Sequence, residues 1–173
     1  MNLLHRVRRS RLLIAAVGLV AAGALFASMG VAHADVLYDG IYRNWASGNC
    51  LDSDYGTAYS IPCNGGRNQD WSIDHVDTLS GYIFGYHIID DKTGWCLDTN
   101  SSDVYTHRCV SGDPNQVWWM YGLDGTHQVW VNKAFRSILW DNGCGCGNGS
   151  LQMETVQNPW AVTNGQGIWR DGY

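Results

Sequence analysis

Apolar and polar side chains alternate in short runs through most of the chain. The runs "YIFGYHII" (82–89) and "HQVWV" (127–131) are examples, and Gly, Asn and Asp separate them from their neighbours. Alternation with a period of two is typical of a β-strand that buries one face. No stretch after residue 34 sustains an apolar period of 3.6 residues, which a surface helix would need. The pattern therefore predicts an all-β domain of short strands joined by turns.

The first 34 residues follow a different pattern. "MNLLHRVRRSRLL" contains four arginines and no acidic residue, an apolar run extends from Leu12 to about Ser28, and "VAHA" ends at Ala34. A basic segment, an apolar core and a small-x-small site are together typical of a secretory signal peptide. We expect cleavage after Ala34 and secretion of residues 35–173 into the extracellular space. A membrane anchor is the weaker interpretation, because the apolar run is barely long enough to span a bilayer. The arginine pair leaves the choice between Sec and twin-arginine export open.

One short phrase occurs twice in the remaining chain. "NQDW" (68–71) returns as "NQVW" (115–118), and "CLD" precedes each phrase, at 50–52 and at 96–98. In both copies a second cysteine follows the first by 13 residues. Two phrases that recur with nearly the same spacing indicate repeated structural units.

A weaker third copy extends the series. "LWD" (139–141) lies 21 residues before Trp160 of "QNPW", much as each "CLD" precedes its tryptophan by 21 or 22 residues. Units of this length cannot bury an apolar face alone, so three of them predict a closed arrangement. The expected units, or lobes, of the single domain 35–173 are about 37–80, 81–124 and 125–170.

These residues identify a family resemblance. Three copies of Cys-Leu-Asp and Gln-x-Trp, two complete and one degenerate, resemble the ricin B-type lectins over nearly all of residues 37–170. The resemblance implies a β-trefoil, with about twelve strands in three pseudo-equivalent lobes, and it implies carbohydrate binding. A propeller is the other architecture with repeats of this length, but three blades cannot close a propeller.

The repeated tryptophans have a structural interpretation. We expect Trp71, Trp118 and Trp160 to fill the shared core, one from each lobe, because a buried indole supplies a large apolar area. Gln69 and Gln116 are expected to satisfy backbone groups beside that core. On this interpretation the phrase repeats because threefold packing repeats.

The aspartates and asparagines have a functional interpretation. A sugar hydroxyl both donates and accepts hydrogen bonds, so a sugar pocket needs a carboxylate, an amide and an aromatic face. By resemblance, Asp52 and Asn68 in lobe one, and Asp98 and Asn115 in lobe two, are the sugar-contacting positions. The alternative is that such side chains only close turns. Two matched copies favour binding.

The expected stacking aromatic departs from the family pattern. Ile61 and His107 occupy the position, two residues before the second cysteine, where the family usually has Trp or Tyr. Tyr59 and Tyr105 lie two residues earlier and share the same face of a strand, so we expect them to supply the ring. Lobe two, which has both Tyr105 and His107, is predicted to be the stronger site.

Lobe three is predicted to be structural. It keeps Asp141, but "QN" (157–158) replaces Asn-Gln and "SLQME" (150–154) contains no aromatic residue.

Six cysteines in an exported chain favour disulfides. The matched spacings predict Cys50–Cys63 and Cys96–Cys109. Cys144 and Cys146 have only each other, and a bond across one residue is strained, so a surface disulfide and two free thiols both remain open. Four zinc ligands do not occur together in the sequence, and no metal site or cofactor is predicted.

The charge balance limits the partners. Residues 35–173 contain all 16 acidic residues but only 7 of the 11 Lys and Arg. Such a surface repels nucleic acid and an anionic membrane, so neither is expected as a partner after cleavage. Neutral partners remain, and the resemblance implies a glycan of the galactoside or xylan type.

The sequence gives little support for catalysis. Residues 35–173 contain one glutamate, Glu154, and neither G-x-S-x-G nor H-E-x-x-H. Glycoside hydrolysis needs two facing carboxyl groups, and no aspartate pair stands out. We expect a secreted, non-catalytic carbohydrate-binding protein. The alternative is a β-trefoil scaffold or inhibitor that contacts proteins through its loops, which Ile61 favours in lobe one.

Overall fold

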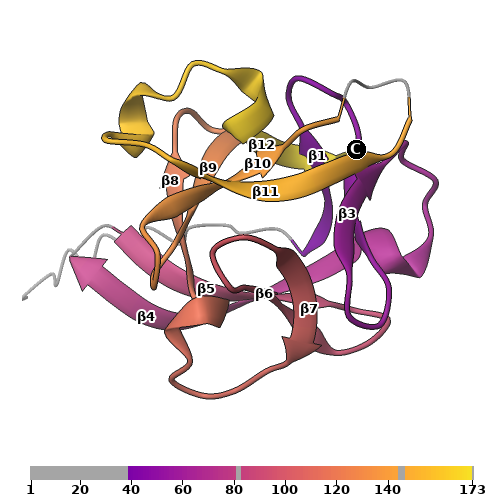
Figure 1. Cartoon of the computed structure of the whole chain (residues 1–173), viewed down its shortest axis with the longest axis horizontal. Coiled ribbons are helices and arrows are strands. Elements are labelled where there is room, and N and C mark those ends of the chain that lie inside the picture. Colours follow the sequence, from indigo (N-terminus) through magenta and orange to yellow (C-terminus); the bar gives the residue numbers. More distant parts are fainter. Residues whose placement is uncertain (1–38, 81–82, 144–146, 173) are drawn as a thin grey trace, which may run out of the picture. The chain divides into compact units, whose positions relative to one another are not determined.

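The computed structural model describes residues 39–80, 83–143 and 147–172 (Figure 1). The chain divides into two units, Met1–Asp35 and Val36–Tyr173, and all described residues belong to the second. The expected signal peptide, and Cys144 with Cys146, lie outside the described residues. Among the described residues, no helix has the length and hydropathy of a membrane span.

The described residues form twelve strands and four short 3-10 helices, which confirms the predicted all-β class. The strands are β1 (Gly40–Asn44), β2 (Cys50–Ser53), β3 (Ala58–Ile61), β4 (Asp70–Ser80), β5 (Ile83–Asp90), β6 (Trp95–Thr99), β7 (Val104–Arg108), β8 (Trp118–Gly122), β9 (His127–Asn132), β10 (Ser137–Asp141), β11 (Gly149–Thr155) and β12 (Trp169–Gly172). The 3-10 helices are η1 (Arg67–Gln69), η2 (Pro114–Gln116), η3 (Pro159–Ala161) and η4 (Gly165–Gly167).

Six of the strands close a barrel. β1 pairs with β12 and β4, β5 pairs with β4 and β8, and β9 pairs with β8 and β12. Closure leaves the barrel without the unpaired strand edges of an open sheet.

The other six strands form three antiparallel hairpins, β2–β3, β6–β7 and β10–β11. Each hairpin follows a barrel strand and pairs with it, so every lobe consists of four consecutive strands. In Figure 1 lobe one runs from indigo to magenta and lobe three from orange to yellow, and β11 of lobe three lies alongside β3 of lobe one. This arrangement is the predicted β-trefoil.

The core repeats one hydrogen bond in each lobe. Three fully buried tryptophans each donate the indole N–H to the backbone carbonyl of a buried leucine in the hairpin of the same lobe. The pairs are Trp71 with Leu51 (3.1 Å), Trp118 with Leu97 (2.9 Å) and Trp169 with Leu139 (3.2 Å). Because a buried indole N–H needs an acceptor, these bonds fix which residues are equivalent among the lobes.

The prediction that Trp160 fills the core is wrong. Trp160 lies in η3 with 55% of its surface exposed, and Trp169 occupies the core position. Trp169 follows Leu139 by 30 residues, whereas the separation is 20 in lobe one and 21 in lobe two. The longer connection contains η3, where the Asn158 side chain accepts a hydrogen bond from the backbone N–H of Trp160. The "QNPW" phrase therefore forms a local turn on the surface.

Both predicted disulfides are confirmed. Cys50 is bonded to Cys63 and Cys96 to Cys109, and in each pair the second cysteine follows the first by 13 positions. Each bond joins the beginning of the first hairpin strand to the loop that follows the hairpin.

Candidate functional site

The β6–β7 hairpin of lobe two brings a carboxylate, a phenol and an amide together. Asp98 lies directly opposite Tyr105 in the hairpin and is only 3% exposed. The Oδ2 atom of Asp98 accepts a hydrogen bond of 2.8 Å from Nε2 of the fully buried Gln116. The Oδ1 atom is buried and accepts no hydrogen bond within the described part of the chain. One oxygen of this carboxylate is therefore anchored and the other is an unpaired acceptor.

Gln116 connects this carboxylate to the loop after β7. Its Nε2 also donates to the Arg108 carbonyl (3.0 Å), and its Oε1 accepts from the Val110 backbone N–H (2.8 Å). The sequence predicted only the backbone contacts, and the bond to Asp98 was missed. No sequence signal indicates that Gln116 also bonds Asp98. The two residues are 18 positions apart and meet only when the hairpin folds against η2.

Burial raises the pKa of Tyr105 most, and the charge of Asp98 and a contact of the Tyr105 hydroxyl with that carboxylate raise it further. Tyr105 therefore keeps its proton at neutral pH and remains a hydrogen-bond donor beside the carboxylate.

Lobe one repeats this arrangement. Asp52 lies opposite Tyr59, and the buried Gln69 accepts a 2.8 Å hydrogen bond from the Asn64 backbone N–H. Burial raises the pKa of Asp52, although contacts with Gln69 and Tyr59 act in the opposite direction. Burial and then the Asp52 charge raise the pKa of Tyr59 to about 12. The repeat of the same three residue types shows that the hairpins of lobes one and two build the same polar set.

The two asparagines are positioned differently from the expectation. Asn115 lies in η2, where its backbone N–H donates to Asp113 Oδ1 and its carbonyl accepts from Asn132 Nδ2 at 2.7 Å. Within the described residues the Asn115 side chain makes no hydrogen bond to Asp98. Asn68 is half-buried, and its Oδ1 has no partner among the residues that the structure describes. The fold thus uses the backbone of Asn115 in the η2 turn, and its side-chain amide makes no hydrogen bond to the described residues.

The outer residues of the hairpins form different surfaces in the two lobes. His107 is exposed and lies opposite Cys96, whereas Ile61 lies opposite Cys50. The His107 ring is 6.3 Å from the ring of Trp95, measured between centroids, and Trp95 is 5.8 Å from Tyr55. The sequence pattern did not indicate Trp95 or Tyr55 as site residues. Trp95 immediately precedes the first cysteine of its repeat, but Tyr55 comes from the other lobe, and its proximity depends on the fold.

Lobe three replaces the polar set with an apolar pair. Trp140 follows Leu139 and so occupies the position of Asp52 and Asp98, which makes the predicted alignment of Asp141 with those residues wrong by one position. Gly167, two residues before the core tryptophan, occupies the glutamine position. A Cβ atom on Gly167 would lie 3.1 Å from Cε3 of Trp140, so the indole packs directly against this glycine.

Asp141 has a structural role in the observed contacts. It is fully buried, and its carboxylate accepts hydrogen bonds from the hydroxyls of Ser47 and Ser60 and from the backbone N–H of Gly143. Because both serines belong to lobe one, Asp141 joins the first and third lobes.

One group of possible metal ligands occurs among the described residues. Ligand atoms of His87, Cys96 and Cys109 lie within 4.8 Å of one another. Both sulfurs are in the Cys96–Cys109 disulfide, so this group offers a single imidazole as a ligand.

Comparison with solved structures identifies other proteins of the same fold. A designed threefold-symmetric protein, ThreeFoil, has 20% identity and a TM-score of 0.61, and the match covers 75% of this chain and 94% of that one. The hemolytic lectin CEL-III has 20% identity and a TM-score of 0.58, with 79% and 30% covered. SeviL, solved with asialo-GM1 saccharide, has 17% identity and a TM-score of 0.58, with 79% and 100% covered. At these identities the likeness concerns the fold alone.

No curated protein sequence matches the chain. A family model, described as the ricin-type beta-trefoil lectin domain, matches residues 38–159, which is more than half of the chain. The repeated hairpins, the core tryptophans and this match agree, and the chain belongs to the ricin-type β-trefoil lectin family.

Proposed function

We propose that the protein is a secreted, non-catalytic lectin that binds a glycan at lobe two, with lobe one as a second, weaker site. The observation that carries this proposal is the unpaired Oδ1 of Asp98, held beside Tyr105 by the bond between Gln116 and Oδ2. A buried acceptor without a partner costs about 1–3 kcal/mol. A sugar hydroxyl removes that cost by donating to Oδ1.

The remaining groups complete a sugar site. Asn115 supplies an amide that donates and accepts, and the rings of Tyr105 and His107 supply an apolar face for the C–H side of the sugar. Asp98 is 3% exposed, so binding involves a shift of the Tyr105 ring away from the carboxylate. Lobe one has Ile61 in place of His107 and is proposed to bind more weakly.

The composition of each site supports binding without hydrolysis. In the hairpins of lobes one and two a single aspartate, Asp52 or Asp98, lies directly opposite a tyrosine. Glycosidases use two carboxyl groups that flank the scissile bond, one with a raised pKa. We therefore propose a module that holds a neutral glycan of the galactoside or xylan type and does not cleave it.

A glycan array probed with the protein tests the proposal. The parent is expected to bind at least one neutral glycan, and Asp98→Asn is expected to weaken binding ten- to a hundredfold, which corresponds to the 1–3 kcal/mol of the lost hydrogen bond. Asp52→Asn is expected to have a smaller effect. Asp74→Asn changes an exposed aspartate on β4 and is the matched control. A parent that binds no glycan would reject the lectin proposal.

A protein-contacting scaffold is the second candidate. The observation that favours it is Trp160, a half-exposed indole on the extra connection of lobe three. If the array is negative and Trp160→Ala abolishes capture of a partner protein, this candidate replaces the first.

A further inference from the structure

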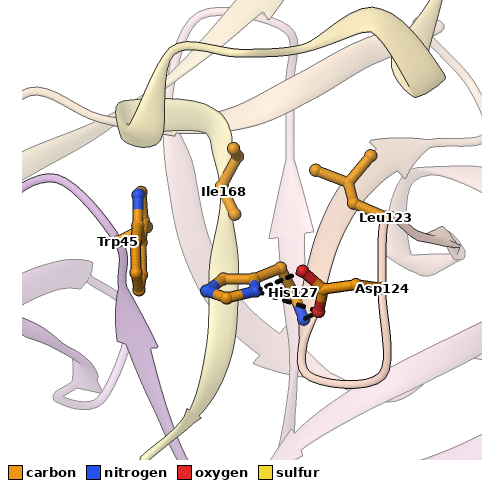
Figure 2. A pocket seen from close by; sticks show the side chains of 5 residues that line it. All are labelled: Trp45, Leu123, Asp124, His127 and Ile168. Atoms are coloured by element: carbon orange, nitrogen blue, oxygen red, sulfur yellow. Dashed lines mark hydrogen bonds and ion pairs between the residues drawn. The ribbon is translucent and has the colours of Figure 1, made fainter.

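A pocket of about 200 Å³ lies where lobe three meets lobe one, away from the hairpin sites. It is lined by Trp45, which follows β1, by Leu123 and Asp124 of the β8–β9 turn, by His127 at the start of β9, and by Ile168 before β12. Figure 2 shows Trp45 on one side of the pocket, Leu123 and Asp124 on the other, and His127 between them. The volume is below the roughly 300–1,000 Å³ of drug-sized sites and suits a single ring.

Trp45 is half-exposed, at 49%, yet it is held on several sides. Its backbone N–H donates to the Ile168 carbonyl at 2.8 Å. The Arg170 guanidinium lies 5.0 Å from the indole centroid, and the His127 ring meets the indole edge-to-face at 4.4 Å. A Cβ atom on Gly165 would lie 2.7 Å from Cδ1 of Trp45, so the indole also rests against that glycine. An aromatic face that is already immobile loses little entropy when a ligand covers it.

Among the described residues, the other two lobe junctions do not present such a face. The bond from Trp45 to Ile168 is repeated from Asp91 to Asp70 (3.0 Å) and from Lys133 to Val117 (2.9 Å). At those junctions the residue equivalent to Trp45 is charged and paired. Lys133 forms a 2.6 Å ion pair with Asp77, and the Asp91 carboxylate accepts a hydrogen bond from the Ser72 hydroxyl.

Two polar groups sit opposite the indole and are themselves fixed. Asp124 Oδ1 accepts backbone hydrogen bonds from Thr126 and His127, and Oδ2 contacts His127 Nδ1 at 2.8 Å. These bonds hold the pKa of Asp124 below its usual range, so the carboxylate stays ionised. His127 Nε2 is buried without a hydrogen-bond partner among the described residues, and it points toward Trp45 (Figure 2).

The charges around the pocket decide the class of ligand. A cation over Trp45 would meet Arg170, and an anion would meet Asp124. A neutral ring that carries hydroxyls avoids both. Its C–H face packs against the part of the indole that His127 and Arg170 leave exposed, and a hydroxyl donates to Asp124 Oδ2, which retains acceptor capacity.

We propose that this pocket binds one neutral sugar ring of a glycan, as a site separate from those at Asp52 and Asp98. The class of ligand rests on the proposed function, while the residues and their geometry are independent of it. Two separate sites on one domain make binding to a long or branched glycan bivalent, which raises the apparent affinity by roughly 10²–10⁴ when both sites are engaged.

Nuclear magnetic resonance of the tryptophan indole N–H signals tests the pocket directly. Methyl glycosides of galactose, xylose, glucose and N-acetylglucosamine are added in turn to the protein and to Asp98→Asn. At least one sugar is expected to shift the Trp45 signal saturably in both proteins. The Trp160 signal, from an indole of similar exposure outside the pocket, is expected not to move.

Variants separate the pocket from the hairpin sites on an immobilised polysaccharide. Trp45→Ala is expected to lower the apparent affinity by about tenfold or more, since it removes one arm of a bivalent contact. Gly165→Ala displaces the indole without removing it and is expected to act in the same direction. Trp160→Ala is the control. Thermal unfolding verifies that each variant is folded.

The outcomes distinguish this inference from the proposed function. A Trp45 signal that no sugar moves, while glycan binding remains sensitive to Asp98→Asn, overturns the pocket and leaves the lectin proposal intact. A saturable shift of Trp45 together with insensitivity to Asp98→Asn supports the pocket and removes the lobe-two site. The absence of any sugar response in both experiments overturns both proposals.

Discussion

At the scale of single residues, the buried aspartate and glutamine occur together in lobes one and two and are both absent from lobe three. Lobes one and two pair Asp with Gln, whereas lobe three has Trp140 packed against Gly167. Removing one partner of a buried polar pair leaves the other without a hydrogen bond and lowers stability. Replacing both partners with apolar groups that fit can leave stability nearly unchanged. Lobe three therefore lacks both members of the pair and keeps a packed interior.

The alkaline stability of the protein depends partly on Tyr59. Its pKa is raised from 10.0 to about 12, so above pH 10 the unfolded chain releases this proton while the folded chain retains it. The stability that this group contributes is present below pH 10 and is lost as the pH rises toward 12.

We expect the thermal stability of Tyr59→Phe to fall less steeply between pH 10 and 12 than that of the parent. Tyr55→Phe is the control, because this exposed ring lies in the same hairpin. Equal slopes for Tyr59→Phe and the parent would contradict this prediction.

At the scale of elements, the sequence predicted what is encoded locally. Strand alternation, the Asp–Tyr hairpins and both disulfides fall within about 20 residues, so spacing alone was informative. The core tryptophan of lobe three was predicted wrongly because no motif in the sequence reports the length of a surface loop. The phrase "QNPW" resembles the core phrase, but its Asn158 only caps η3. The Gln116–Asp98 bond and the Trp45 pocket were also beyond prediction, since both join separate elements.

The corrected alignment of lobe three predicts opposite behaviour for two tryptophans. Trp169→Ala removes a fully buried indole and is expected to lower the free energy of unfolding by about 3–5 kcal/mol. Trp160→Ala removes an exposed one and is expected to change it by less than about 1 kcal/mol. Denaturant titration compares the two. A larger effect of Trp160→Ala would restore the alignment that the structure rejects.

At the scale of the whole domain, closure of the barrel depends on its last strand. β12 pairs with both β1 and β9, and it supplies the third core tryptophan. Without β12 both strands lose a pairing partner, and the core loses one of its fully buried indoles.

We expect a chain that ends at Val162, before η4 and β12, to fail to fold cooperatively. Circular dichroism during heating is the measurement, with the complete chain as the reference. A sharp thermal transition in the shortened chain would show that two and a half lobes suffice.

The pairing of β1 with β12 has one more consequence. Ile41 lies opposite Gly172, so the first and last strands of the domain are neighbours in space. Joining them with a short linker and opening a β4–β5 or β8–β9 turn would give a circular permutant that begins with another lobe and retains every strand pair. The strand pairing of the folded domain is therefore compatible with more than one order of the lobes along the chain.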